Sequence, residues 1–360
     1  MYSSSPLDNT PRWQEFSHGY ESWTLILNDS QSQFGWWIEF SIIRTMDSPP
    51  LGAVKFVYFN RYQPEKENRF FCQTFPADQC RVNTTDGHAF ECKFGDNHLQ
   101  EHRSNGCISR PAETVTWDVR WVPEPERNFV PFPSKALYRW KHPRSKLVTP
   151  NPLIHIDGTV TIGSLSLDIE GGAGSQHHLW STQLPSHLAW FHCSAFEETD
   201  FAWIQGLTTR GKFFNLCHPR VSLLHFNMYD IGYPFNRIPD MARTSSDYTL
   251  HRWVLAAERQ THRTQIEIQN APVNMVREEM ALTADRQTYR HFTTLASAQV
   301  IFSERQAGTW NILHKLTCRN AATLLVFRSE PDPRVPLLRQ PEGSSDEANN
   351  PAPGTRNPNM

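Results

Sequence analysis

Long apolar runs and a surplus of one charge are both absent from this 360-residue chain. Lysine and arginine number 35 against 37 aspartate and glutamate. This balance gives no basic excess that would favour nucleic acid or an anionic membrane surface. No apolar stretch approaches the ~20 residues of a membrane helix. The sequence therefore predicts neither a nucleic-acid partner nor an integral membrane segment.

Paired cysteines are also missing. The seven cysteines are an odd number, and none of them forms a CxxC pair. The first residues, MYSSSPLDNTPRWQEF, show no charged segment followed by an apolar run, so we expect no signal peptide. A cytoplasmic protein with reduced thiols is the interpretation that these features favour.

Motifs that hold a cofactor are absent as well. No GxGxxG follows a strand-like run, and neither GxxxxGK[ST] nor GxSxG occurs. Histidines and cysteines are numerous around residues 177–218, but their spacing fits no zinc pattern such as HExxH. We expect no redox or nucleotide cofactor and no metal.

Aromatic residues are plentiful, with 12 Trp, 22 Phe and 9 Tyr. Such residues favour strands and line apolar ligand pockets. Many short strand-like segments follow one another at close spacing, and the best helical candidate, Asn274–Ala284, has a weak period. An all-β chain of antiparallel barrels or sandwiches is the fold that this pattern predicts. The clearest strand candidates are Gly19–Asn28, Phe34–Arg44 and Gly52–Asn60, with shorter ones at Leu153–Ile156, Thr159–Ile162 and Leu165–Ile169.

The length of the chain favours two domains. A proline-bounded joint near residues 139–149 suggests where one half ends. The last thirty residues hold seven prolines and no aromatic residue, which is typical of disorder. The predicted divisions are a flexible leader at 1–14, a β domain at 15–145, a second β domain at 146–330 and a disordered tail at 331–360.

Polar, titratable and aromatic side chains gather most densely in Gly174–Cys193. In an extended chain, alternate residues share a face, so His178 lies beside Trp180 and Trp190 lies beside His192. A histidine beside a tryptophan is what a lined cavity would show. The alternative is that these are core residues whose imidazoles bond to neighbouring strands.

A carboxyl group forms part of the first strand candidate. Glu21 shares a face with Trp23, and an inward acid among aromatic rings could donate a proton. It could equally pair with an arginine or lysine at a barrel mouth. Glu39 ranks below it. Gln205, Trp203 and Tyr229 lie in later strand candidates, where polar residues more often face solvent than a pocket.

Several segments resemble a known family. HGYESWTLILND, FGWWIEFSIIR, PRSKLVTPNPLIHIDGTVTIGSLSLDIEG and HLWSTQLPSHLAWFHCSAF occur in the same order as in the lipocalin-like proteins grouped with hydroxyneurosporene synthase (carotenoid 1,2-hydratase) and tocopherol cyclase. The resemblance covers roughly residues 18–328. It implies two consecutive lipocalin-like antiparallel β-barrels with few helices, holding an apolar ligand. Family members hydrate or cyclise isoprenoid double bonds, and related enzymes guide polyketide cyclisation.

The central motif departs from the family pattern. Relatives usually read His-Asn-Trp-Gly and then Trp-x-Trp-x-His. This chain has Leu179 in place of asparagine, Ser181 in place of glycine, and Leu188 in place of the first tryptophan. The loss of asparagine removes a polar group that could orient substrate or water.

These observations predict a hydratase or cyclase that acts on a C=C bond of a hydrophobic isoprenoid- or polyketide-like molecule by proton donation in an aromatic-lined barrel pocket. The alternative is a lipocalin-like carrier without chemistry, and a third possibility is a structural protein whose barrels are filled by side chains. The oligomeric state is left open. The expected catalytic residues are His178, His192 and Glu21, and the expected ligand-binding residues are Trp180, Trp190, Trp23, Trp203, Gln205 and Tyr229.

Overall fold

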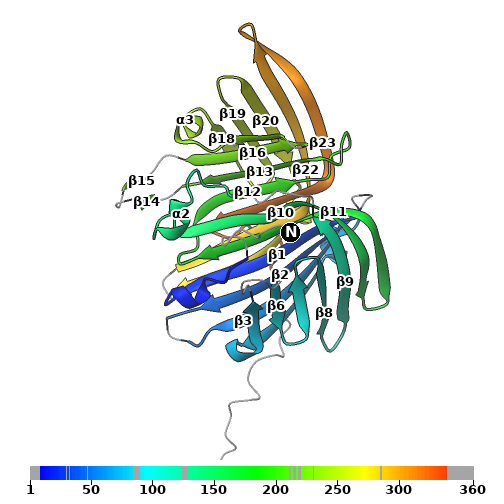
Figure 1. Cartoon of the computed structure of the whole chain (residues 1–360). Coiled ribbons are helices and arrows are strands. Elements are labelled where there is room, and N and C mark those ends of the chain that lie inside the picture. The colour runs from blue at the N-terminus through cyan, green and yellow to red at the C-terminus, as the bar shows by residue number, and fades with distance from the viewer. Residues whose placement is uncertain are drawn as a thin grey trace, which may run out of the picture.

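The computed structural model has an all-β architecture built from two large antiparallel sheets (Figure 1). This confirms the predicted fold class. No helix in the described part of the chain is long and apolar enough to cross a membrane. The structure describes residues 9–29, 31, 33–46, 48–83, 90–123, 129–210, 212–213, 216–217, 220–229, 231–283 and 286–338.

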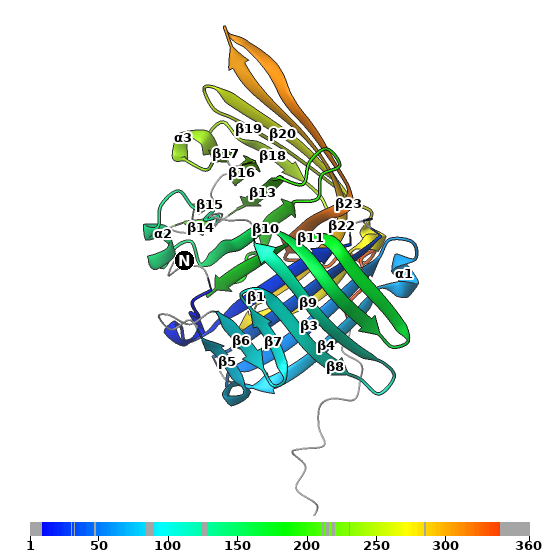
Figure 2. The same ribbon diagram turned by 45° about the vertical axis from the view of Figure 1, so that its right-hand side comes forward.

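The first sheet has eleven strands and curls into a barrel around an aromatic core (Figure 2). Its centre is the pairing of β1 with β11, which joins the first strand to one far along the chain. In spatial order the strands are β4 (Arg69–Pro76), β3 (Leu51–Asn60), β2 (Phe34–Arg44), β1 (Gly19–Asn28), β11 (Leu165–Ser181), β10 (Ser145–Ile162), β9 (Thr114–Pro123), β8 (Arg103–Ser109), β7 (Asn97–Gln100), β6 (Glu91–Phe94) and β5 (Cys80–Asn83).

The second sheet has ten strands, and its long β22–β23 hairpin projects away from the first sheet (Figure 1). Its strands in spatial order are β17 (Ile231–Phe235), β16 (Val221–Met228), β13 (Ala202–Thr209), β12 (His187–Cys193), β23 (Thr309–Arg328), β22 (Arg286–Gln306), β20 (His262–Gln269), β19 (Arg252–Glu258) and β18 (Ser245–Tyr248), with β21 (Val276–Thr283) also beside β22.

Short elements connect these strands. The remaining elements are the small pair β14 (Lys212–Phe213) and β15 (Leu216–Cys217), the helices α1 (Pro64–Glu67), α2 (Ala136–Arg139) and α3 (Ile238–Met241), and the 3-10 turns η1 (Trp13–Glu15), η2 (Ala77–Gln79) and η3 (Pro272–Asn274).

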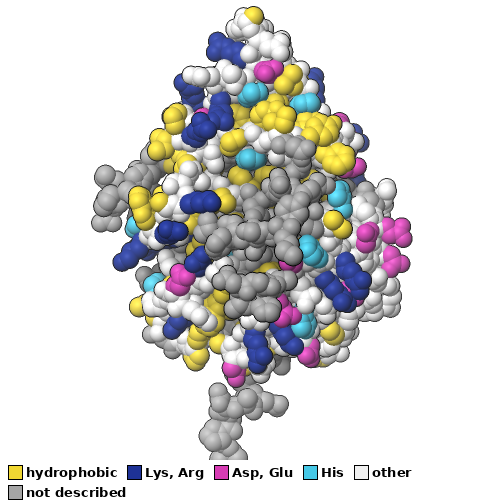
Figure 3. All heavy atoms as spheres, viewed as in Figure 1, with side chains coloured by type: hydrophobic (Ala, Val, Ile, Leu, Met, Phe, Trp, Pro, Cys, Tyr) yellow, Lys and Arg dark blue, Asp and Glu magenta, His cyan; other side chains and the backbone are white. Residues whose placement is uncertain are grey.

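Charged side chains of both signs are interspersed over the face shown in Figure 3, without a large patch of one sign.

Both faces of β1 are buried, and large apolar side chains lie on each of them. Trp23 and Leu25 point into the core of the first barrel, whereas Tyr20 and Ile26 point toward the second sheet. The apolar side chains packed between the two sheets are called the intersheet layer below. They are Tyr20, Ile26, Trp37, Val57, Phe59, Leu147, Leu184, Leu188, Trp190, Leu207, Leu223, Val276, Met280, Leu282, Phe292, Leu295, Leu325 and Phe327.

The division between the two halves differs from the expected one. Residues 145–181 form β10 and β11 of the first sheet, and the chain enters the second sheet at His187. The change of sheet therefore falls at 182–186 and not at residue 145. The reason is that β11 pairs with the edge of β1 that β2 does not cover. The proline-bounded joint instead precedes a strand of the same sheet.

The helical candidate at Asn274–Ala284 instead contains the strand β21, Val276–Thr283. Its residues favour helix on their own, but pairing with β22 decides its structure. Val276 and Met280 face the intersheet layer, whereas the residues between them do not belong to it. An alternating face suits a strand, and this contact determines the conformation.

The ends of the described chain are more ordered than expected. In the predicted leader, the backbone N–H of Arg12 donates to a buried carboxylate. In the predicted tail, Val335 is buried, and Leu338 donates a backbone hydrogen bond to the carbonyl of Arg277. Residues 331–338 thus pack beside β21. Residues 1–8 and 339–360 lie outside the described part of the chain.

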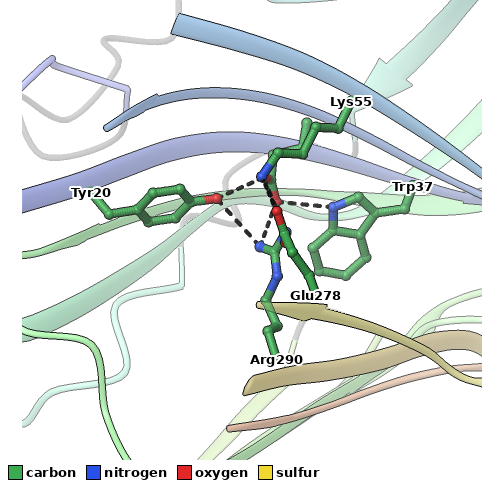
Figure 4. Close-up of polar contacts among 6 residues, drawn as sticks. Tyr20, Trp37, Lys55, Glu278 and Arg290 are labelled. Carbon is green, nitrogen blue, oxygen red and sulfur yellow. Dashed lines mark hydrogen bonds and ion pairs between the residues drawn. The ribbon is translucent and has the colours of Figure 1, made fainter. Parts of the chain in front are cut away.

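A fully buried carboxylate ties the two sheets together (Figure 4). Glu39 on β2 accepts hydrogen bonds from Tyr20 at 2.6 Å and from the Trp37 indole at 3.1 Å. Arg290 on β22 of the other sheet donates to both its oxygens, at 2.7 and 3.2 Å. Lys55 on β3 lies 3.3 Å from the same group. The carboxylate has four donors.

Glu278 on β21 completes this network by pairing with both Lys55 and Arg290. Two carboxylates therefore face two cations. Burial alone would raise the pKa of Glu39, but Arg290 and Lys55 outweigh that effect and hold the pKa well below its usual range. The network consists of Tyr20, Trp37, Glu39, Lys55, Glu278 and Arg290 and is called the clasp below. Its Glu39 carboxylate stays ionised at neutral pH.

A second tie lies further along the same strands. The Asn28 amide donates to the carbonyl of Thr294 at 2.9 Å. Gly35 lies directly below this contact, and a Cβ atom there would approach Thr294 Oγ1 to 2.0 Å. The absence of a side chain at this position is what lets β2 and β22 come so close.

Replacement of Arg290 by methionine should lower the free energy of unfolding by about 3–5 kcal/mol, because the buried Glu39 and the partly buried Glu278 would then share Lys55 as their cation. Urea unfolding at pH 7 measures this. Arg103→Met, which breaks the exposed pair with Asp118, is the matched control and should cost little. Equal small losses in both variants would contradict the role given to the clasp.

Candidate functional site

The structure divides the predicted site residues between two places. β11 belongs to the first sheet and β12 to the second, so the two halves of the central stretch face different surroundings. Glu21, Trp23, His178 and Trp180 meet inside the first barrel. The residues that β12 and β13 contribute lie between the sheets.

Inside the first barrel, Glu21 and His178 form a direct pair. The register of β1 and β11 sets Glu21 opposite Trp180 and Trp23 opposite His178. His178 Nε2 lies 2.7 Å from Glu21 Oε1, and both side chains are completely buried. Trp23 stacks on the imidazole with 5.1 Å between ring centroids, and Trp180 lies 4.9 Å away. The expected combination of acid, histidine and indoles is present as a cluster.

The leader segment closes this cluster. The backbone N–H groups of Arg12 and Trp13 donate to the Glu21 carboxylate at 2.9 and 2.6 Å. The Trp23 indole in turn donates to the carbonyl of Asn9 at 3.1 Å. Together with His178, these contacts satisfy the carboxylate.

Between the sheets, a second group of polar and aromatic side chains is buried, and we call it the intersheet cluster. The register of β12, β13 and β16 sets His192 beside Gln205 and Gln205 beside His225. Rings from both sheets touch, with His177 4.8 Å from Trp190 and 5.2 Å from His192. The cluster consists of Thr149, Ser175 and His177 from the first sheet and Trp190, His192, Trp203, Gln205 and His225 from the second.

A chain of hydrogen bonds fixes the first-sheet side of the cluster. Ser175 Oγ lies 2.8 Å from His177 Nε2, and Thr149 Oγ1 lies 3.2 Å from His177 Nδ1 and 2.8 Å from Gln205 Oε1. Since Thr149 donates its one hydroxyl proton to Gln205, it accepts from Nδ1–H, and Ser175 donates to Nε2. This order requires a neutral His177, and burial followed by the nearby His192 holds the pKa of His177 well below its usual range.

His192 has a defined tautomer. Its ring bonds to the backbone of Pro152, which can only accept, and Nε2 has no partner among the described residues. Nδ1 therefore carries the proton, and Nε2 is an open acceptor. Burial lowers the pKa of His192 to about 3, although the bond to Pro152 acts in the opposite direction. The ring is neutral at physiological pH.

Further polar atoms in the cluster also lack partners. Trp190 Nε1, Trp203 Nε1 and Gln205 Nε2 are buried without a hydrogen bond to any described residue. All three are N–H donors, and their side chains lie on the same face of the second sheet as His192. With His192 Nε2, these atoms give three donors and one acceptor in an aromatic surrounding, and His225 Nδ1 is a further buried ring nitrogen without a partner among the described residues. These groups suit the oxygen atoms of an otherwise apolar ligand.

Tyr229 lies elsewhere. It follows the end of β16 with φ of 53° and is 54% exposed, stacked on Phe201. Tyr229 was expected to lie in a strand, but β16 ends at Met228, because the chain turns there. The structure thus separates Tyr229 from both clusters.

Sequence reasoning left His177 and His225 out of the expected site residues. The signal for His177 was available: it is the neighbour of His178 and must point to the opposite face of β11. That face of β11 is buried only if a second sheet covers it.

Among the described residues, no three His, Cys, Asp or Glu side chains are grouped so that they could hold a metal ion.

Comparisons with known proteins agree on the fold. No family model matches the chain, and no curated protein matches it by sequence. The solved structure of CghA is similar with a TM-score of 0.55 and 10% identity, covering 92% of this chain and 96% of that one. CghA with Sch210972 gives 0.52 and 9% over 87% and 88%. Kievitone hydratase from Nectria haematococca gives 0.45 and 13% over 86% and 89%.

The low pKa of His192 predicts a stability loss in acid. Its folded pKa of about 3 lies below the ordinary 6.5, so between these values the unfolded chain binds the extra proton. Stability therefore falls as pH falls through this window. His192→Gln should reduce the slope of unfolding free energy against pH by about 1.4 kcal/mol per pH unit between about pH 5.5 and 4.

Urea unfolding at several pH values measures this slope. Trp190→Phe is the control, because it alters the same cluster without removing a titrating group. It should keep the wild-type slope. A His192→Gln variant with an unchanged slope would mean that His192 gains its proton in the folded protein.

Proposed function

We propose that the chain is a hydratase- or cyclase-type enzyme that acts on a C=C bond of an apolar isoprenoid- or polyketide-like molecule at the intersheet cluster. The observation that carries this proposal is the set of unpartnered polar atoms on Trp190, His192, Trp203 and Gln205. Each buried group without a partner costs about 1–3 kcal/mol. A ligand that supplies oxygen atoms to them recovers this energy, and the aromatic rings hold its apolar body.

The groups have the chemistry for adding water to a conjugated double bond. Trp190 and Gln205 donate to the carbonyl oxygen of the substrate, and this polarises the adjacent C=C bond. Water bonds to the β-carbon as His192 Nε2 takes one of its protons. The C=C electron pair forms a double bond between the α-carbon and the carbonyl carbon, and the C=O π pair moves onto the carbonyl oxygen. The imidazolium then delivers that proton to the α-carbon as the carbonyl re-forms. A low pKa makes the imidazolium a strong acid, which favours this last transfer.

The same surroundings suit cyclisation. Indole faces stabilise developing positive charge by about 0.5–2 kcal/mol each. Donors on a carbonyl also lower the energy of ring closure without any proton transfer. CghA, which shares the fold, has been solved with Sch210972, which supports a small-molecule site in this architecture. Hydration and cyclisation are thus both proposed for the same class of apolar substrate.

A carrier without chemistry is the second candidate. The observation that favours it is the saturation of Glu21, which the Arg12 and Trp13 backbone and His178 satisfy. The acid of the first barrel is therefore already paired. On this alternative, the unpartnered donors of the intersheet cluster bind the oxygen atoms of a cargo molecule.

Native mass spectrometry of protein from its own host, followed by organic extraction, tests both candidates. We expect one apolar, oxygen-bearing molecule in near-stoichiometric amount. Incubated with fresh protein, it or its precursor should be converted, and His192→Gln should slow turnover by about 100-fold or more. Retention of the ligand without conversion by wild type would favour the carrier.

Glu21→Gln tests whether the reaction takes place in the first barrel or at the intersheet cluster. We expect it to keep most of the turnover, because Glu21 lies in the first barrel and not in the intersheet cluster. A loss of turnover in Glu21→Gln with activity kept in His192→Gln would move the reaction to the Glu21–His178 pair. Circular dichroism and the unfolding midpoint of both variants serve as folding controls.

A further inference from the structure

We propose that a hollow at the edge of the intersheet layer binds the carboxylate of an apolar acid. The hollow has a volume of about 260 Å³. It lies where the β11–β12 connection of the first half faces β21 and β22 of the second sheet. Eight residues line it: His18, Arg144, Thr182, Gln183, Leu184, Leu282, Thr283 and Thr288.

The rim of the hollow favours an anion. Among the described residues that line the hollow, the ionisable ones are Arg144 and His18, and none is an aspartate or glutamate. One Arg144 nitrogen donates to Gln183 Oε1 at 2.6 Å, and Arg144 forms no ion pair with a described residue. The remaining guanidinium N–H groups can donate two parallel bonds, the arrangement that matches a carboxylate.

The floor supplies a second, independent observation. The Thr288 side chain is completely buried, yet its Oγ1 has no hydrogen-bond partner among the described residues. Thr288 precedes Arg290 by two residues on β22, so the hollow ends beside the clasp. The charges of the clasp are already balanced there. The unpaired hydroxyl can therefore donate to an incoming oxygen.

The apolar walls show where the rest of the ligand goes. Leu184 and Leu282 are almost fully buried, and they belong to the intersheet layer together with Trp190. The apolar body of an acid bound at Arg144 would thus lie against Leu184 and Leu282, at the edge of the layer that also contains Trp190. As a statement about the substrate, this inference rests on the proposed function, whereas carboxylate binding at the hollow can be tested without it.

The test compares decanoate with its methyl ester and with decanol, using titration calorimetry on the full chain. We expect decanoate to bind about 10-fold or more tightly than either neutral analogue, since a hydrogen bond to a charged group contributes about 1.5–3 kcal/mol. Arg144→Gln should remove this preference, and Thr288→Val should weaken decanoate binding several-fold. Equal binding of acid and ester to wild type would overturn the proposal.

Two matched variants control for side effects. Arg120→Gln removes an exposed arginine of β9 outside the hollow, and Thr264→Val removes another fully buried, unpartnered hydroxyl on β20. Both should retain the preference for decanoate. If Arg120→Gln lost it equally, the effect would be one of net charge and the hollow would not be the site. Thr288→Val should be as stable as wild type, because no bond is lost.

The two proposals fail in different ways. Loss of the acid preference in Arg144→Gln, with no effect of His192→Gln on turnover, would support the hollow and refute the catalytic role of the intersheet cluster. The reverse pattern would refute the hollow alone. Acetate that competes as well as decanoate would contradict the role given to Leu184 and Leu282, because only the carboxylate would then be recognised.

Discussion

Glu39 is a carboxylate without access to water, and its partners determine how the two sheets meet. A buried ion network contributes little net stability, because desolvation offsets most of the Coulomb attraction. Its effect here is directional: Arg290 reaches Glu39 and Glu278 from one side, and Lys55 reaches both from the other. Apolar side chains in the intersheet layer could slide past one another, but these bonds fit only one alignment.

The intersheet cluster depends on that alignment. Ser175, His177 and Thr149 come from the first sheet, and Gln205 and His192 come from the second. Neither sheet therefore contains the whole cluster. The hydrogen bond from Thr149 to Gln205 crosses the intersheet layer. It orients the Gln205 amide so that the amide nitrogen has no hydrogen-bond partner among the described residues. The first-sheet side is thus saturated, and the second-sheet side retains the open groups.

Much of the fold could be predicted where a strand is flanked by turn residues. The bounds of β1 and β2 agree with the predicted Gly19–Asn28 and Phe34–Arg44, because these segments rich in aromatic and aliphatic residues end there at the polar Asn28 and Arg44. β10 was harder to predict, since Asp157–Gly158 looks like a turn between two short strands. In the structure it is an irregular point within one long strand, which pairs with β11 on one side and β9 on the other. Local sequence does not report such support.

The candidate site shows a similar limit. Period-2 alternation correctly sets His178 beside Trp180 and Trp190 beside His192, since that depends only on extended backbone. Which surroundings each pair faces depends on the sheet that its strand joins, and β11 and β12 join different sheets. The pairing of Glu21 with His178 spans 157 positions. No spacing rule within one segment could have found it.

The same long-range pairing has a consequence for how the chain is made. During synthesis, β1 leaves the ribosome first but must wait for β11 before one of its edges is covered. Until then, one edge of β1 stays open, and an open strand edge can pair with other chains. Closing so long a loop is also slow. The first barrel therefore cannot close until about half of the chain has been made, and in this interval aggregation competes with folding.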